Sequence, residues 1–289
     1  MTLKKLTLAL ALSGLPLLAN AAQVLTTLPV THSLAAALLD GTSVQLKSAV
    51  PDNLPASRQP SYFEGRGGAS LQKAAQQADA VIGVRSIWRD DPLYPMARRS
   101  NIRIVEIDAA RPVDGALPGI AVIGEQAFAA YPWLNPTNLG RMADVVANDL
   151  ERLSPADKAK IQGNLAGLKR QMLELTASSQ AQLAEVDNLS VVSLSERLGY
   201  LASGLNLDVV EQPLHADEQW DEAALKALTG NLKQQDVALV LHHRQPDAKV
   251  VAAIEAGGAK LLVVDSDPQD TVAGLKASVE QVVKALGSS

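Results

Sequence analysis

The stretch SPADKAKIQGNLAGLKRQMLELTASSQAQLAEV, residues Ser154–Val186, decides the expected architecture. Ser154 can cap a helix N-terminus, and Pro155 suits the first helical position, where a missing N–H group costs no hydrogen bond. No proline follows within the stretch, and Gly163 and Gly167 are its weak points. The sequence therefore predicts a helix of roughly thirty residues, about 45 Å long. Such a helix exceeds the needs of one small lobe, so we expect it to join two lobes.

Segments of α/β character lie on both sides of this helix. Before it, the expected strands are Val24–Leu28, Ser43–Lys47, Ala80–Val84 and Ile102–Ile107. After it, they are Ser190–Leu194, Leu207–Val210, Val237–Leu241 and Lys260–Val264. Strands that alternate with helices form mostly parallel sheets. We therefore expect an α/β fold with an N-terminal lobe (residues 23–136), a helical segment containing the long helix (137–186), and a C-terminal lobe (187–289).

The first residues have the features of an export signal. Lys4 and Lys5 form a positive end, Leu6–Leu18 is an apolar run, and Ala19–Ala21 is a small-residue cleavage site. The apolar run is too short to span a membrane, and no later segment offers ~20 consecutive apolar residues. We therefore expect residues 1–22 to be a signal peptide and the mature protein to be exported without a membrane span.

Composition excludes several classes of function. Removing residues 1–22 takes two lysines from 26 basic side chains and leaves 31 acidic ones, so the mature charge is 24 minus 31, or −7. This balance provides no electrostatic footprint for nucleic acid, which needs clustered Lys and Arg. The absence of cysteine excludes thiolate chemistry. Ser195 lacks a Gly-x-Ser-x-Gly context and no His-Glu-x-x-His pattern occurs, so we expect no enzyme.

The segment Tyr131–Pro136, YPWLNP, resembles the His-x-Trp-Leu-Asp-Pro signature of the zinc and manganese solute-binding proteins of ABC importers. Ala78–Gly83 resembles the Ala-Asp strand of that family, and Gly199–Leu201 falls where the family has Gly-Tyr-Phe. Leu241–Lys249 and Val263–Asp265 match two further stretches. The resemblance covers nearly the whole mature chain. It implies two α/β lobes joined by a rigid helix, with the ligand bound between them.

Most metal-ligand positions of that family are changed in this chain. The resemblance places the first histidine near Phe63, beside Glu64, the second on Tyr131 and the third on Ser195. None of these aligned side chains is a good ligand for a divalent transition metal. The chain also lacks the long His/Asp-rich loop that many zinc receptors carry.

The fourth ligand position falls on His243 and the last on Asp265. These two side chains can bind zinc, so the resemblance implies a metal site containing both of them. Zinc takes about four ligands, and further residues or water would have to complete the set. The other candidates for the cleft are Glu64, Tyr131, Ser195, Glu196 and His242.

Less specific interpretations stand beside these. Neighbouring residues of a strand point to opposite faces, so we expect His243 to line the cleft and His242 to serve packing or the surface. Asp265 follows a strand, where an aspartate also caps an ordinary turn. Four arginines near expected loop ends would favour a carboxylate or phosphate if they faced the cleft, or else are ordinary surface residues: Arg66, Arg85, Arg89 and Arg244.

The resemblance implies a periplasmic solute-binding protein of a metal ABC import system, with zinc the expected ion because an imidazole is retained. The expected partner is an inner-membrane permease, and the expected state is a monomer. The alternative is a degenerate receptor that no longer binds free metal. It would carry an anionic or chelated ligand, or act as an accessory in metal homeostasis. A third possibility is a structural module of the envelope that uses the bilobed fold as a scaffold.

Overall fold

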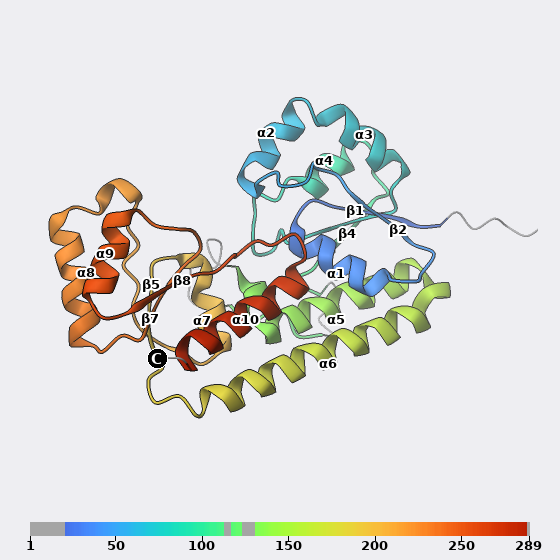
Figure 1. The fold of residues 1–289 in the computed structure, drawn as a ribbon. Coiled ribbons are helices and arrows are strands. Elements are labelled where there is room, and N and C mark those ends of the chain that lie inside the picture. Colours follow the sequence, from blue (N-terminus) through green and yellow to red (C-terminus); the bar gives the residue numbers. More distant parts are fainter. Residues whose placement is uncertain (1–20, 113–116, 123–130, 288–289) are drawn as a thin grey trace, which may run out of the picture.

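The computed structural model describes residues 21–112, 117–122 and 131–287, so the expected export signal lies outside these ranges except for Ala21 and Ala22. The described chain forms two lobes, each built on a four-stranded sheet (Figure 1). The first sheet has the strand order β2-β1-β3-β4 and parallel pairing throughout. Its strands are β1 (Gln23–Thr26), β2 (Gln45–Ser48), β3 (Ala80–Gly83) and β4 (Val105–Asp108).

The second sheet repeats this arrangement, with the order β6-β5-β7-β8 and parallel pairing. Its strands are β5 (Ser190–Ser193), β6 (Asp208–Glu211), β7 (Leu239–His242) and β8 (Lys260–Val263). Three strands begin later than predicted, so Ile102, Leu207 and Val237 lie outside β4, β6 and β7. Ile102 lies in a turn, where its side chain is exposed. The predicted α/β class with parallel sheets is confirmed.

Helices connect the strands of both lobes. The first lobe contains α1 (Pro29–Leu39), α2 (Gln59–Glu64), α3 (Gly68–Gln77) and α4 (Leu93–Arg98). The connecting region contains α5 (Pro136–Leu153) and α6 (Lys158–Leu183). After β5 come α7 (Gly199–Gly204), α8 (Glu222–Gln234), α9 (Ala248–Ala256) and α10 (Thr271–Gly287).

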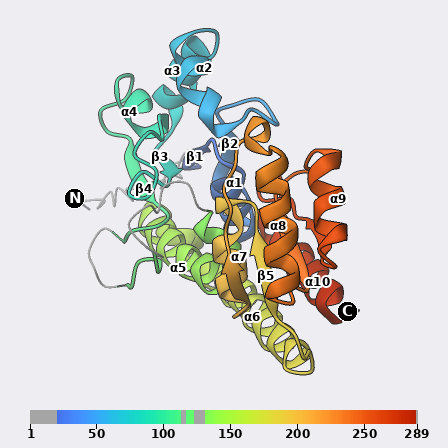
Figure 2. The ribbon, with the colours of Figure 1, turned by 90° about the vertical axis from the view of Figure 1, so that its left-hand side faces the viewer.

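The predicted long helix is confirmed as α6, which has 26 residues. A 3₁₀ turn at Pro155–Asp157 precedes it. Ser154 does not cap the helix as predicted, because its Oγ donates to Asp157 Oδ2 at 2.8 Å instead of accepting from a backbone N–H. In both views, α6 runs beside α5 along one side of the molecule (Figures 1 and 2). This pair of helices forms the rigid connection between the lobes.

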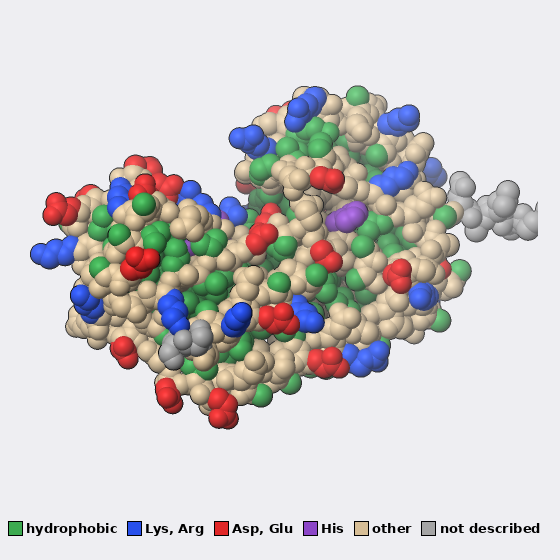
Figure 3. Space-filling model, in the orientation of Figure 1, with side chains coloured by type: hydrophobic (Ala, Val, Ile, Leu, Met, Phe, Trp, Pro, Cys, Tyr) green, Lys and Arg blue, Asp and Glu red, His purple; other side chains and the backbone are tan. Residues whose placement is uncertain are grey.

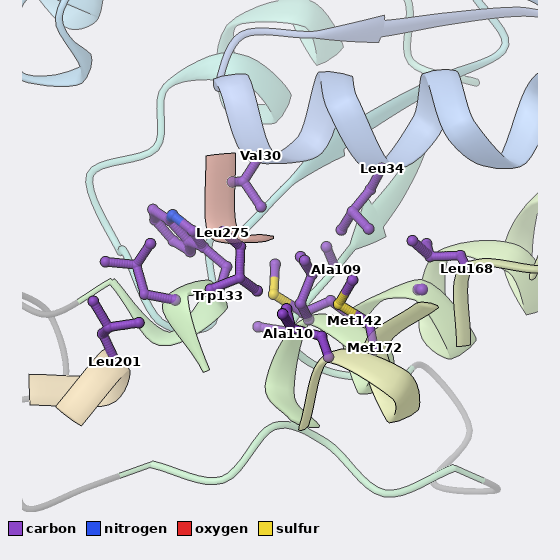
Figure 4. Close-up of a cluster of buried hydrophobic side chains, with 14 of the residues drawn as sticks. Val30, Leu34, Ala109, Ala110, Trp133, Met142, Leu168, Met172, Leu201 and Leu275 are labelled. Carbon is purple, nitrogen blue, oxygen red and sulfur yellow. The ribbon is translucent and has the colours of Figure 1, made fainter. Parts of the chain in front are cut away.

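One hydrophobic core continues across the joint between the lobes. Its buried side chains come from α1, α5, α6, α7 and α10. Figure 4 shows Trp133 near Val30 and Leu275 in this cluster, with Leu201 close by. Each apolar side chain that such a joint buries contributes on the order of 1.5–3 kcal/mol. The core therefore opposes large movements between the lobes.

The last helix returns from the second lobe to the first. α10 packs against α1 and α6. Ser33 Oγ in α1 donates to Asp270 Oδ1 at 2.9 Å, and Ser33 Oγ accepts from the Val272 N–H at 3.3 Å. The loop between β8 and α10 is thereby attached to the first lobe. Among the described residues, none of the helices is long and apolar enough to cross a membrane.

Candidate ligand site

Two polar side chains meet beyond the carboxyl ends of adjacent strands. β5 ends at Ser193 and β7 at His242, and these two strands pair. The residues that follow come together, so that Ser195 Oγ lies 2.7 Å from His243 Nδ1. Ser195 is buried and caps a 3₁₀ helix at Glu196–Leu198, where its Oγ accepts from the backbone N–H of the second helix residue at 3.3 Å. The serine therefore orients the imidazole.

The two neighbouring histidines do not diverge as predicted. Their rings are stacked, with centroids 4.8 Å apart and an interplanar angle of 29°. The alternation of a strand does not extend to His243, because β7 ends at His242. His242 is buried, and its Nδ1 accepts from the Arg244 N–H at 3.0 Å. Its packing role agrees with the prediction, whereas the opposite orientation of the two side chains was wrong.

Arg197 is a part of the site that the sequence analysis missed. Its guanidinium carbon lies 5.0 Å from the centroid of the Tyr131 ring, a cation–π distance. Its Nη1 lies 3.5 Å from Ser266 Oγ, at the limit of a hydrogen bond. Tyr131, just before α5, also contacts Trp133 edge-to-face at 4.9 Å. Arg197 thus lies among residues from three separate segments of the chain.

The two aspartates after β8 have different surroundings. Asp265 is exposed, and its Oδ1 accepts from the Asp267 N–H at 3.0 Å. This is the turn-capping role that the sequence analysis weighed against metal binding. Burial raises the pKa of Asp267 to about 6, while the charge of Arg197 lowers it and that of Asp265 raises it. The electrostatic contact with Arg197 therefore involves Asp267.

The charge of Arg197 is felt by other side chains of the site. Burial lowers the pKa of His243 to about 4, and the charges of Arg197, His242 and Arg244 lower it further. Burial raises the pKa of Tyr131, against the opposing effect of Arg197. At neutral pH the imidazole of His243 is therefore uncharged, and Tyr131 keeps its hydroxyl proton.

The remaining predicted residues lie outside this group. Phe63 is buried in the core of the first lobe with Leu25 and Leu71. Glu64 at the end of α2 and Glu196 beside Ser195 are exposed. In the described ranges, no group of three or more His, Cys, Asp or Glu is arranged to hold a metal ion. The structure brings Tyr131, Ser195 and His243 together through Arg197, but adds no carboxylate ligand set.

Two arginines considered from the sequence already have acidic partners. Arg85 Nε lies 2.8 Å from Glu106 Oε1, and its Nη2 donates to Oε2 at 3.2 Å. Arg244 makes two bonds of 2.8 Å to the carboxylate of Asp217. Neither carboxylate contact is available to Arg197, which has no acidic oxygen within 4.0 Å among the described residues. Strand-end reasoning could not find Arg197, because it lies within the 3₁₀ turn that follows Ser195.

The surface between the lobes is hollowed, as Figure 3 shows. A second groove, of about 1210 Å³, runs between α6 and α10, away from the strand ends. Its walls combine apolar side chains such as Leu175 and Val279 with exposed charges such as Glu174 and Lys276. This groove contains none of the residues brought together by the strand ends, so the hollow between the lobes is the better candidate site.

Known structures share this fold. A crystal structure of ZnuA is 20% identical, with a TM-score of 0.68 over 91% of this chain and 98% of that chain. A mutant of FpvC from Pseudomonas aeruginosa is 18% identical, with a TM-score of 0.73 over 92% of this chain and 100% of that chain. The laminin-binding protein Lbp of Streptococcus pyogenes is 16% identical, with a TM-score of 0.66 over 92% and 99%. Identities this low show the fold alone.

A comparison with curated proteins gives no match. The family model described as "Zinc-uptake complex component A periplasmic" matches residues 24–283, which is most of the chain. The two parallel sheets and the long connecting helix are the arrangement that the sequence resemblance implied. The chain belongs to the ZnuA family of metal-binding solute-binding proteins of ABC transporters.

Proposed function

We propose that this protein is the periplasmic solute receptor of an ABC import system. It binds its solute between the lobes and delivers it to an inner-membrane permease. The observation that carries this proposal is the convergence of Tyr131, Ser195, Arg197 and His243 beside the joint of the lobes. Family membership supports the same role. The mechanism is capture: the two lobes enclose the solute while α6 and the shared core limit the extent of closure.

A direct zinc receptor is the second candidate. AdcA of Streptococcus pneumoniae is described with Zn(II) bound, and FpvC with Ni²⁺ or Mn²⁺. In this chain, His243 favours such a role, because a neutral imidazole oriented by a second side chain is typical of a metal ligand. Zinc would be the transported substrate, bound by His243 and Asp265 with Glu64, Glu196, His242 or water as further donors.

Three observations weigh against capture of the bare ion. The position of the first family ligand is occupied by Phe63, which is in the core. Asp265 is committed to a turn. A divalent ion about 5 Å from the Arg197 charge would be repelled by roughly 7 kcal/mol at an effective dielectric constant of 20. Direct zinc binding is therefore expected to be weak.

Cellular metal content tests the receptor role. A strain lacking the protein would be complemented with the wild type, His243→Ala or His215→Ala, and grown under metal limitation. His215 is the matched control because its ring packs on Trp220, with centroids 4.7 Å apart, outside the proposed site.

We expect the content of one transition metal, measured by mass spectrometry, to fall in the deletion strain and with His243→Ala. The wild type and His215→Ala should restore it. Equal metal content in all four strains would contradict the proposed function.

A further inference from the structure

Arg197 is held in place by the same residues that form the site. Its backbone N–H donates to Ser195 Oγ, which also contacts His243 Nδ1 at 2.7 Å. Its guanidinium lies over the Tyr131 ring and reaches Ser266 Oγ. These contacts hold a permanent positive charge beside three of the positions at which the family resemblance places metal ligands.

The guanidinium has donors to spare. Arginine has five N–H donors in a planar fork that matches a carboxylate. Within the described residues, the single hydrogen bond printed by its geometry is the 3.5 Å contact with Ser266 Oγ, and no carboxylate lies within ion-pair distance. In contrast, Arg85 and Arg244 each bind a carboxylate through two nitrogens. Arg197 is also half-buried, so water solvates its charge less than that of a surface arginine.

We propose that Arg197 anchors a carboxylate group of the solute, so that the site takes an organic acid or its metal chelate and not a bare divalent ion. This inference rests on the proposed import function. The uncharged imidazole of His243 and the hydroxyl of Tyr131 add neutral hydrogen-bonding groups around the anchor. Asp267 keeps a negative charge nearby, which a second acidic group of the solute would avoid and a chelated cation would tolerate.

Calorimetry with three titrants tests this assignment. The exported protein would be treated with chelator and titrated at neutral pH with citrate, zinc chloride or zinc citrate. We expect citrate or zinc citrate to bind, and tighter binding of zinc citrate would identify the chelate as the source of the carboxylate. Equal binding of both forms would identify the free acid. One-to-one binding of zinc chloride without binding of either citrate form would overturn the inference.

Arginine variants show which charge is responsible. Arg197→Gln should weaken citrate binding by at least about tenfold, because it removes charge-assisted hydrogen bonds. Arg197→Lys keeps the charge but loses the fork, so its affinity should fall between those of the wild type and Arg197→Gln. The matched control is Arg244→Gln, which changes a paired arginine of the same lobe and should leave citrate affinity unchanged. Unchanged affinity in both variants of Arg197, with their fold verified by circular dichroism, would refute the anchor.

The outcome is separable from that of the import test. If metal content falls in the deletion strain while zinc chloride alone binds, the receptor role stands and the carboxylate assignment fails. If metal content is the same in all strains and no titrant binds, the proposed function itself fails.

Discussion

Replacing Ser33 by alanine should destabilise the protein although Ser33 touches no ligand residue. Its Oγ donates to Asp270 Oδ1 and accepts from the Val272 N–H, across 237 and 239 residues of sequence. The substitution removes both bonds while leaving the helix intact. Asp270 retains its bond from the Ala273 N–H at 3.1 Å, so it does not become unpaired. The change therefore isolates the link between α1 and the start of α10.

The magnitude follows from these two bonds. A hydrogen bond to a charged group contributes about 1.5–3 kcal/mol, but Asp270 is exposed and water can replace the serine there. The Val272 bond is long, and Val272 is partly buried, so its loss adds a few tenths of a kcal/mol at most. We expect a loss of about 1–2 kcal/mol in the free energy of unfolding. For a chain of this size, such a loss lowers Tm by roughly 2–8 °C.

Urea unfolding of the two proteins, followed by circular dichroism, measures the difference. Ser178→Ala is the matched control, because Ser178 Oγ bonds only within its own helix, to the Leu175 carbonyl at 3.2 Å, in the described contacts. That change should cost less than about 0.5 kcal/mol. Equal unfolding free energies for Ser33→Ala and Ser178→Ala would show that the link between α1 and α10 contributes nothing to stability.

Four further outcomes are expected. In chelator-treated protein, Asp267 contributes stability that is present below its unfolded pKa and lost as pH rises through about 6, so Asp267→Asn should gain in Tm over the wild type at pH 7.5 and lose that gain by pH 4; a gain that is independent of pH would contradict this. Gly274→Ala should cost about 1–3 kcal/mol in urea unfolding, because its Cβ would lie 2.1 Å from Pro268 Cγ. Gly163→Ala, with open space around its Cβ in α6, should stabilise the protein by about 0.5–1 kcal/mol, and a loss there would mean that the helix is strained. If zinc binds directly, His243→Ala should weaken its binding by at least about 10–100-fold in calorimetry, and unchanged affinity would place the ion elsewhere.

Helical and strand periodicity were sufficient for the architecture. The uninterrupted run after Pro155 predicted α6, and buried apolar runs such as Ala80–Val84 predicted strands of the parallel sheets. Both signals are local, because one proline or one change of period alters the element in which it occurs. Strand boundaries were less well predicted. Ile102 has the hydrophobicity of a strand residue but lies in an exposed turn, since β4 starts at Val105 where pairing with β3 begins.

The sequence by itself determined the two α/β lobes, the long connecting helix and the side chains that follow the strand ends, among them Ser195 and His243. The tertiary structure alone decided how these side chains meet. It stacked His243 on His242, placed Asp265 in a turn, and brought Arg197 over Tyr131. The physical reason is that periodicity sets orientation only within a helix or strand. The site residues lie in turns beyond the strands, where their positions depend on packing between segments far apart in the chain.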